Sequence, residues 1–262
     1  MTSDDILLLF DNEIKGRRKG DFLYRDNTIV GTSFSKSYKG EIIINEGVQF
    51  IAAHVFEGYS CTSIQLPNSL LAIGKESFYN CKIKELNFPK GLLFVAENAF
   101  YFSEIESVTL GNSMEIISRE TFSNCYNLKN VNFGDNVKFI QERAFEECTE
   151  LKSIVFPKSL KSIADSAFSG CINLETIIFH SSEVNITYNA FYGCDNLQKI
   201  VTPEKTYTSL DDFLDDLEIR SKQTNSHLPI NLSEESKQSY AFRLYELRKE
   251  HASNEDVMNM IE

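Results

Sequence analysis

Several features by which large classes of protein are recognised are missing from this chain of 262 residues. No stretch approaches the run of about eighteen apolar residues that a membrane-spanning helix needs, so we expect no membrane span. The sequence has no GxSxG, HExxH or CxxC segment and no glycine-rich phosphate loop. The four histidines, His54, His180, His227 and His251, are scattered along the chain. The sequence therefore predicts no catalytic residue, no metal site and no cofactor, and we expect a protein that is not an enzyme.

Positive charge is scarce. Lys and Arg number 26 against 38 Asp and Glu, which gives a formal net charge of −12. The basic run Arg17-Arg18-Lys19 is small against that balance, so we expect no nucleic-acid partner. One group of acids has two interpretations, chelation of a cation or the commoner role of complementing a helix dipole. These acids are Asp211, Asp212, Asp215 and Asp216.

The N-terminus shows no export signal. Met1 is followed by Ser3, Asp4 and Asp5 where a signal peptide has a basic region, and the apolar stretch 6–10 is too short for its core. If the chain is complete, we expect a cytoplasmic protein. If a signal peptide has been removed, we expect a cell-surface or secreted protein.

A periodic ladder of phenylalanines dominates what is present. Its members recur at steps of 22, 22, 22, 23, 23 and 23 residues. They are Phe56, Phe78, Phe100, Phe122, Phe145, Phe168 and Phe191. Repeats of this length predict a solenoid, in which each coil buries its apolar side against its neighbours.

Other columns share the period. Fourteen residues before each phenylalanine lies an aliphatic residue such as Ile64 or Ile154, and two residues further lies a second apolar one. This alternation predicts a short strand with both residues inward. A breaker such as Pro67 or Gly111 ends each strand, and a further apolar pair such as Leu70 and Ile73 predicts a buried return segment. In the last coil Glu183 breaks this pattern, so we expect it to be distorted or exposed.

Five of the six cysteines stand three residues after a ladder phenylalanine: Cys81, Cys125, Cys148, Cys171 and Cys194. Stacked coils hold equivalent side chains parallel, about 4.8 Å apart, which does not suit a disulfide. We expect a buried ladder of free thiols.

These columns resemble the BspA-like, or Treponema-type, leucine-rich repeat over roughly residues 22 to 203. The resemblance is carried by segments such as Cys148-x-x-Leu151-x-x-Ile154-x-Phe156-Pro157-x-x-Leu160-x-x-Ile163-x-x-x-Ala167-Phe168. It implies a right-handed leucine-rich-repeat solenoid with a parallel concave β-sheet. It also implies adhesion or protein binding on the surface of anaerobic bacteria or protozoa, and no catalytic residues. Residues 21–40 are similar to the hairpin-like cap that often precedes such arrays.

We divide the chain into a capping helix (1–20), the repeat array (21–203) and an acidic helical segment (204–262). The first helix is expected at about 3–15, with Ser3 as its N-cap. Further helices are expected at about 209–221, 233–250 and 254–261, the first with a capping box of Ser209 and Asp212. The C-terminal segment has three interpretations, a cap for the last coil, a partner-binding or linker segment, and a disordered tail.

The outward strand positions predict where a partner binds. They are polar in mid-array, with Thr109 and Asn132, and aliphatic over the last three coils, with Val155, Ile178 and Val201. Adjacent strands would place the last three side by side, and an exposed apolar strip usually marks an interface.

His180, just past the strand of Ile178, completes the expected partner site. Either Tyr240, Leu244 and Leu247 fold back over the strip, or the C-terminal helices cap the array and leave it to a partner. We expect the second.

The sequence therefore predicts a non-catalytic module that recognises a protein on its concave face. The alternative is a cell-surface or secreted adhesin of an anaerobic bacterium or protozoan. An enzyme with its chemistry in the C-terminal helices would need residues that the sequence does not show.

Overall fold

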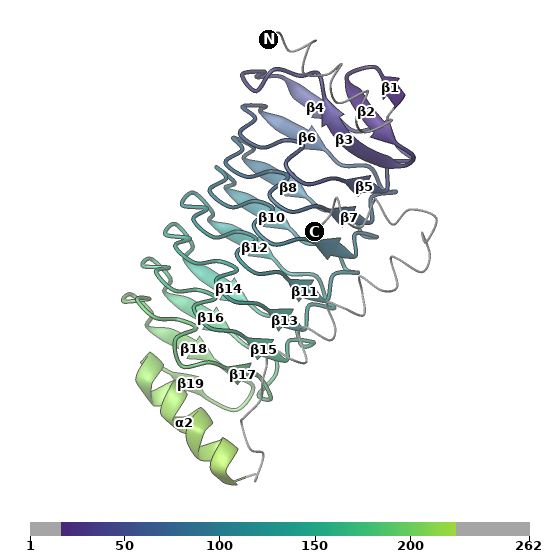
Figure 1. Ribbon diagram of the computed structural model, residues 1–262. Coiled ribbons are helices and arrows are strands. Elements are labelled where there is room, and N and C mark those ends of the chain that lie inside the picture. Colours follow the sequence, from purple (N-terminus) through teal and green to yellow (C-terminus); the bar gives the residue numbers. More distant parts are fainter. Residues whose placement is uncertain (1–16, 224–262) are drawn as a thin grey trace.

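The computed structural model describes residues 17–223. They form a solenoid of stacked coils, with antiparallel strands at the N-terminal end and a helix across the other (Figure 1). This confirms the predicted fold class. The helices expected at about 3–15, 233–250 and 254–261 lie outside the described residues.

Three antiparallel strands open the described chain: β1 (Arg17–Lys19), β2 (Phe22–Arg25) and β3 (Thr28–Thr32). Gly20 and Asp26 make the two turns with positive φ angles of 63° and 50°. β3 then pairs in parallel with a strand of the first coil, so the cap continues the sheet of the array. The hairpin-like cap is as expected. The basic run Arg17–Lys19 forms β1, a strand that the sequence analysis did not predict.

Each coil has one three-residue strand, and these strands stack in parallel along one side of the solenoid. The middle residue points into the core and the two flanking residues point outward, as period-two alternation requires. The strands are β4 (Glu41–Ile43), β6 (Ser63–Gln65), β8 (Glu85–Asn87), β10 (Ser107–Thr109), β12 (Asn130–Asn132), β14 (Ser153–Val155), β16 (Thr176–Ile178) and β18 (Lys199–Val201).

A proline or glycine follows most of these strands, and at the glycines the neighbouring coils approach closely. A Cβ atom added to Gly134 would lie 2.5 Å from the carbonyl oxygen of Gly111 in the preceding coil. The same crowding occurs between Gly111 and Pro89. Glycine at these positions therefore allows the close approach of neighbouring coils, because it has no Cβ atom.

The return segments form a second set of parallel strands, where we predicted only buried chain. Both residues of most of these strands are buried. They are β5 (Phe50–Ile51), β7 (Ala72–Ile73), β9 (Phe94–Val95), β11 (Ile116–Ile117), β13 (Phe139–Ile140), β15 (Ser162–Ile163) and β17 (Asn185–Ile186). In the last coil Glu183 is exposed, as expected, and its neighbour Val184 is buried instead.

The ladder phenylalanines form one continuous buried spine. All seven rings are at most 1% exposed, and successive rings stack at centroid distances between 4.9 and 5.4 Å. The turn around each of the first six rings closes with left-handed backbone two residues before it, for example at Glu120, and two residues after it, for example at Asn124. Backbone bonds between turns, such as Phe78 N–H to the Ala99 carbonyl at 2.8 Å, hold the coils at this spacing.

The cysteine column is buried as free thiols, as predicted, and the stack gives each thiol an acceptor. Each Sγ donates to the carbonyl oxygen of the ladder phenylalanine one coil earlier, at 2.7 to 3.3 Å. Ser103 stands at a column position without cysteine, and its hydroxyl donates the equivalent bond to the Phe78 carbonyl oxygen at 2.7 Å. Burial raises the pKa of Cys81 and Cys125 to about 12. These thiols are therefore structural donors.

Candidate binding surface

The outward side of the three-residue strands, here called the strand face, presents two columns of side chains. The third strand position gives the column that the sequence analysis used. The first position gives a second column, which was missed from the sequence. It consists of Glu41, Ser63, Glu85, Ser107, Asn130, Ser153, Thr176 and Lys199. Each strand therefore contributes two outward side chains to the strand face, one from its first position and one from its third.

The predicted aliphatic strip is formed in the structure. Val155 pairs with Ile178, and Ile178 with Val201, as direct neighbours on β14, β16 and β18. Val155 is 47% exposed, and the other two are partly exposed. Ser153, Thr176 and Lys199 lie in register along one side of the strip, so it has a polar border.

The remaining residues of the predicted site lie around this strip. Thr109 and Asn132 are exposed and directly paired on β10 and β12. His180 follows β16, and its Nδ1 lies 2.9 Å from the Phe156 carbonyl oxygen. Because a carbonyl only accepts, this bond places the ring proton on Nδ1 and fixes the imidazole beside the strip.

The described part of the C-terminal segment closes the end of the array. β19 (Thr206–Tyr207) pairs antiparallel with β18, and α2 (Leu210–Gln223) packs across the last coil (Figure 1). Phe213 of α2 is buried with its ring 5.5 Å from Phe179 and 5.2 Å from Tyr207. Ser209 Oγ accepts a 3.1 Å bond from the Asp212 N–H, so it caps the helix as predicted.

A notch opens between the last coil and α2, lined by apolar side chains and hydroxyls that include Val184, Ile186, Thr202 and Leu217. No acid, histidine or thiol is among the side chains that line it. Of the acids for which chelation was considered, Asp216 accepts a 2.5 Å bond from the Tyr207 hydroxyl. In residues 17–223 no three His, Cys, Asp or Glu side chains are grouped as a metal site requires.

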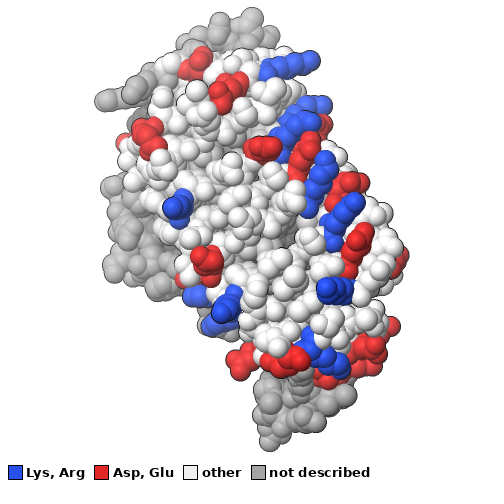
Figure 2. Space-filling view, turned by 180° about the vertical axis from the view of Figure 1, so that it is seen from behind, with Lys and Arg blue, Asp and Glu red and all other residues white. Residues whose placement is uncertain are grey.

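Charged side chains of both signs line the molecule's edge. Figure 2 shows acids and bases alternating along one edge. Ion pairs also join neighbouring coils. Glu106 Oε1 lies 2.9 Å from Lys84 Nζ, and its Oε2 lies 3.0 Å from Lys129 Nζ. These two ammonium groups lower the pKa of Glu106 to about 2. Exposed pairs of this kind are individually weak.

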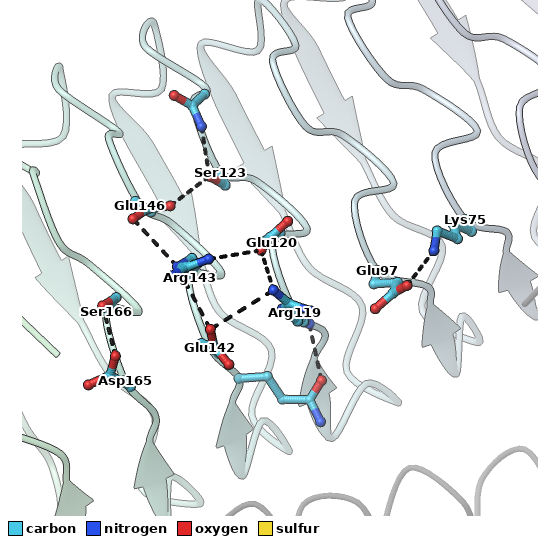
Figure 3. Close-up of polar contacts among 12 residues, drawn as sticks. Lys75, Glu97, Arg119, Glu120, Ser123, Glu142, Arg143, Glu146, Asp165 and Ser166 are labelled. Atoms are coloured by element: carbon cyan, nitrogen blue, oxygen red, sulfur yellow. Dashed lines mark hydrogen bonds and ion pairs between the residues drawn. The ribbon is translucent and has the colours of Figure 1, made fainter. Parts of the chain in front are cut away.

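A second charged network lies on the turns of the middle coils. Figure 3 shows Arg143 among Glu120, Glu142 and Glu146, at distances of 3.6 to 3.7 Å. Arg119 lies 2.9 Å from Glu120. The arginines are thus shared among several acids.

The chain belongs to the BspA-type leucine-rich repeat family. The family model of the BspA type leucine rich repeat region matches this chain with six copies, over residues 27–152 and 115–242. This match confirms the resemblance drawn from the repeat columns. A comparison with curated proteins found no match.

Solved structures of bacterial leucine-rich-repeat proteins have the same fold. A leucine-rich repeat protein of T. pallidum is 27% identical over 70% of this chain and 90% of its own, with a TM-score of 0.63. One from Eubacterium ventriosum is 21% identical over 72% of this chain, with a TM-score of 0.61. This chain matches 50% of the length of the Eubacterium protein. In residues 17–223 no helix is long and apolar enough to cross a membrane.

Proposed function

We propose that this protein is a non-catalytic binding module that recognises a protein partner on the strand face over its last three coils. The observation that carries the proposal is the strip of Val155, Ile178 and Val201 in register on adjacent strands. Family membership suggests protein interaction or a surface role in general terms. We propose the strip as the place on this molecule where a protein partner binds.

The composition of the strip suits an interface. Aliphatic side chains at its centre lose water on contact, and Ser153, Thr176 and Lys199 provide the polar border typical of a recognition surface. His180 and Asn132 add groups that can form directional hydrogen bonds. α2 packs at the end of the array, so residues 17–223 leave Val155 open to a partner.

The test compares single aspartate substitutions in otherwise identical protein. Partners captured by the wild type from its source cells are assayed for binding to Val155→Asp and Ile178→Asp. We expect both substitutions to abolish binding, because a buried carboxylate without a partner is costly. We expect the melting temperature of Val155→Asp to change little, and that of half-buried Ile178→Asp to fall somewhat more.

Ile43→Asp is the matched control. Ile43 occupies the same repeat position on β4 and is 53% exposed, but lies at the other end of the array. It should bind like the wild type. Full binding by Val155→Asp and Ile178→Asp would refute the proposed site. Unfolding of Val155→Asp would show that the strip belongs to the core.

The family also suggests a second candidate, a cell-surface or secreted adhesin, which would use the same strip outside the cell. Labelling of intact cells with a reagent that cannot cross the membrane separates the two. Labelled protein favours the adhesin, and protein labelled only after lysis favours an internal partner.

A further inference from the structure

A cluster of four aromatic rings lies on the turns of the second to fourth ladder phenylalanines. Tyr79 and Tyr101 each follow a ladder phenylalanine directly, and their rings stack at 5.7 Å. Phe102 meets Tyr101 edge-on at 4.7 Å, and Tyr126 of the next coil meets Phe102 at 5.9 Å. Phe102 is 38% exposed and Tyr126 is 44% exposed. The rings thus form a continuous aromatic surface that is open to solvent.

Phe102 is an unusual residue for its backbone. Its φ angle is 60°, in the left-handed region that bulky side chains avoid. The equivalent turn positions of the other coils hold glycine, asparagine or, once, glutamate: Gly58, Asn80, Asn124, Glu147, Gly170 and Gly193. Of the eleven non-glycine residues with positive φ in residues 17–223, Phe102 is the only apolar one.

This placement has a cost in the fold. Left-handed backbone is less favourable for a residue with a bulky side chain than for glycine, because the Cβ atom crowds the following carbonyl oxygen. The ring recovers contact with three tyrosines, but it remains more than one-third exposed. A strained backbone that holds an apolar ring at the surface is a feature of binding sites.

The surroundings of the cluster are acidic. Over the turns 76–82, 98–104, 120–126 and 143–149, acids outnumber bases. The acids are Glu76, Glu104, Glu120, Glu146 and Glu147, and the bases are Lys82 and Arg143, with Arg119 next to the third of these turns and 2.9 Å from Glu120. The pKa of Tyr101 is raised by burial and by the nearby charges of Glu120 and Glu146. The pKa of Glu146 is raised by burial and, against the effect of Arg143, by the charges of Glu120 and Glu147.

We propose that this aromatic cluster is a second binding surface, which takes a cationic side chain, an arginine, of a protein partner. Aromatic faces attract a guanidinium through the ring quadrupole, and adjacent carboxylates add to the attraction. A carboxylate held among like charges gains from a cation. A neutral apolar partner would use the rings but none of the acidic surroundings. The surface is carried by the turns and is separate from the strip on the strand face.

The test is a titration followed by NMR of protein with ring-labelled tyrosine. The probe is the peptide acetyl-Gly-Arg-Gly-Arg-Gly-amide, and the control peptide has citrulline, the neutral isostere, in place of arginine. The arginine peptide should shift the signals of Tyr79, Tyr101 and Tyr126, and added salt should reduce the shifts. Tyr192 is the internal control, because it occupies the repeat position of Tyr101 in the last coil and is 72% exposed.

Phe102→Asn is the decisive variant, because Asn80 and Asn124 occupy the same position in the adjacent coils. It should retain the fold and bind the arginine peptide roughly twofold to fivefold more weakly, the loss expected for one exposed cation–ring contact. Tyr126→Leu leaves residue 102 unchanged and should show a similar loss of affinity for the arginine peptide. It replaces Phe102→Asn in the test if that variant does not fold.

Four results would overturn the inference. Equal shifts with the citrulline peptide would show that charge is not recognised. Equal shifts at Tyr192 and Tyr101 would show only general attraction to an acidic protein. Unchanged affinity in both variants would show that the rings do not form the site. Absence of any shift at millimolar arginine peptide would equally refute it.

Discussion

Truncation of a ladder ring in mid-array should have a large effect on stability. Phe145 has no exposed surface and lies between Phe122 and Phe168 at 5.3 and 5.1 Å, with Phe133 edge-on at 5.8 Å. Removing a fully buried phenylalanine ring costs about 3 to 5 kcal/mol through lost burial and the cavity left behind. We expect Phe145→Ala to fall within this range, and Phe122→Ala to do the same.

The spacing of the coils favours the upper part of that range. The Phe145 N–H donates to the Ala167 carbonyl at 2.8 Å, and similar bonds link every neighbouring turn of the middle coils. The backbone therefore cannot move inward to fill the cavity without loss of these bonds. Phe191 has a single stacked ladder neighbour, at 5.4 Å. Truncation of Phe191 should therefore lower the free energy of unfolding less than truncation of Phe145 does.

The assay is urea unfolding followed by circular dichroism, with the slope of the transition compared between variants. Equal slopes are needed because a solenoid can unfold in parts. Phe102→Ala, which removes an exposed ring from the same part of the array, is the control and should cost under about 1 kcal/mol. A loss under about 1 kcal/mol for Phe145→Ala would show that this column does not form the core.

Two further predictions concern ionisable groups. The five repeat cysteines should remain unreactive to a thiol reagent in native protein and react once denaturant is added, because all five are buried and burial also raises the pKa of Cys81, Cys125, Cys148 and Cys171; disulfide-linked peptides recovered by mass spectrometry would contradict this. The pKa of Glu106, about 2, should return toward its ordinary value in the Lys84→Ala, Lys129→Ala double variant. Since the pKa is lowered on folding, its contribution to stability is present above the unfolded value near 4.5 and is lost as pH falls toward 2. An unchanged pKa in an NMR titration of the double variant would exclude the two lysines as its cause.

The repeat columns were predictable because one chemical type recurs at a fixed step. A phenylalanine every 22 or 23 residues, with apolar residues at constant distances before it, has one consistent arrangement, in which equivalent residues stack. Burial of the thiols followed from the same argument. So did the exposure of Glu183, since a charge replaces an apolar residue there.

The second set of strands was missed because it has no pattern within one coil. Two residues are too few for alternation to be visible, and the bonds that define these strands run between coils. The left-handed residues around each turn were missed for a related reason. Residues as different as Glu120, Asn124 and Phe102 adopt that conformation because the turn imposes it.

The two candidate surfaces show what each level of structure decides. The strip of Val155, Ile178 and Val201 could be found from the sequence, because all three occupy one column of the repeat. The aromatic cluster could not, because Tyr126 stands at a different repeat position from Tyr101. Only the stacking of one coil on the next brings Tyr126 against Phe102, which Tyr101 already contacts. The sequence therefore determined the coil and its core, and the tertiary structure decided which side chains of different coils meet at the surface.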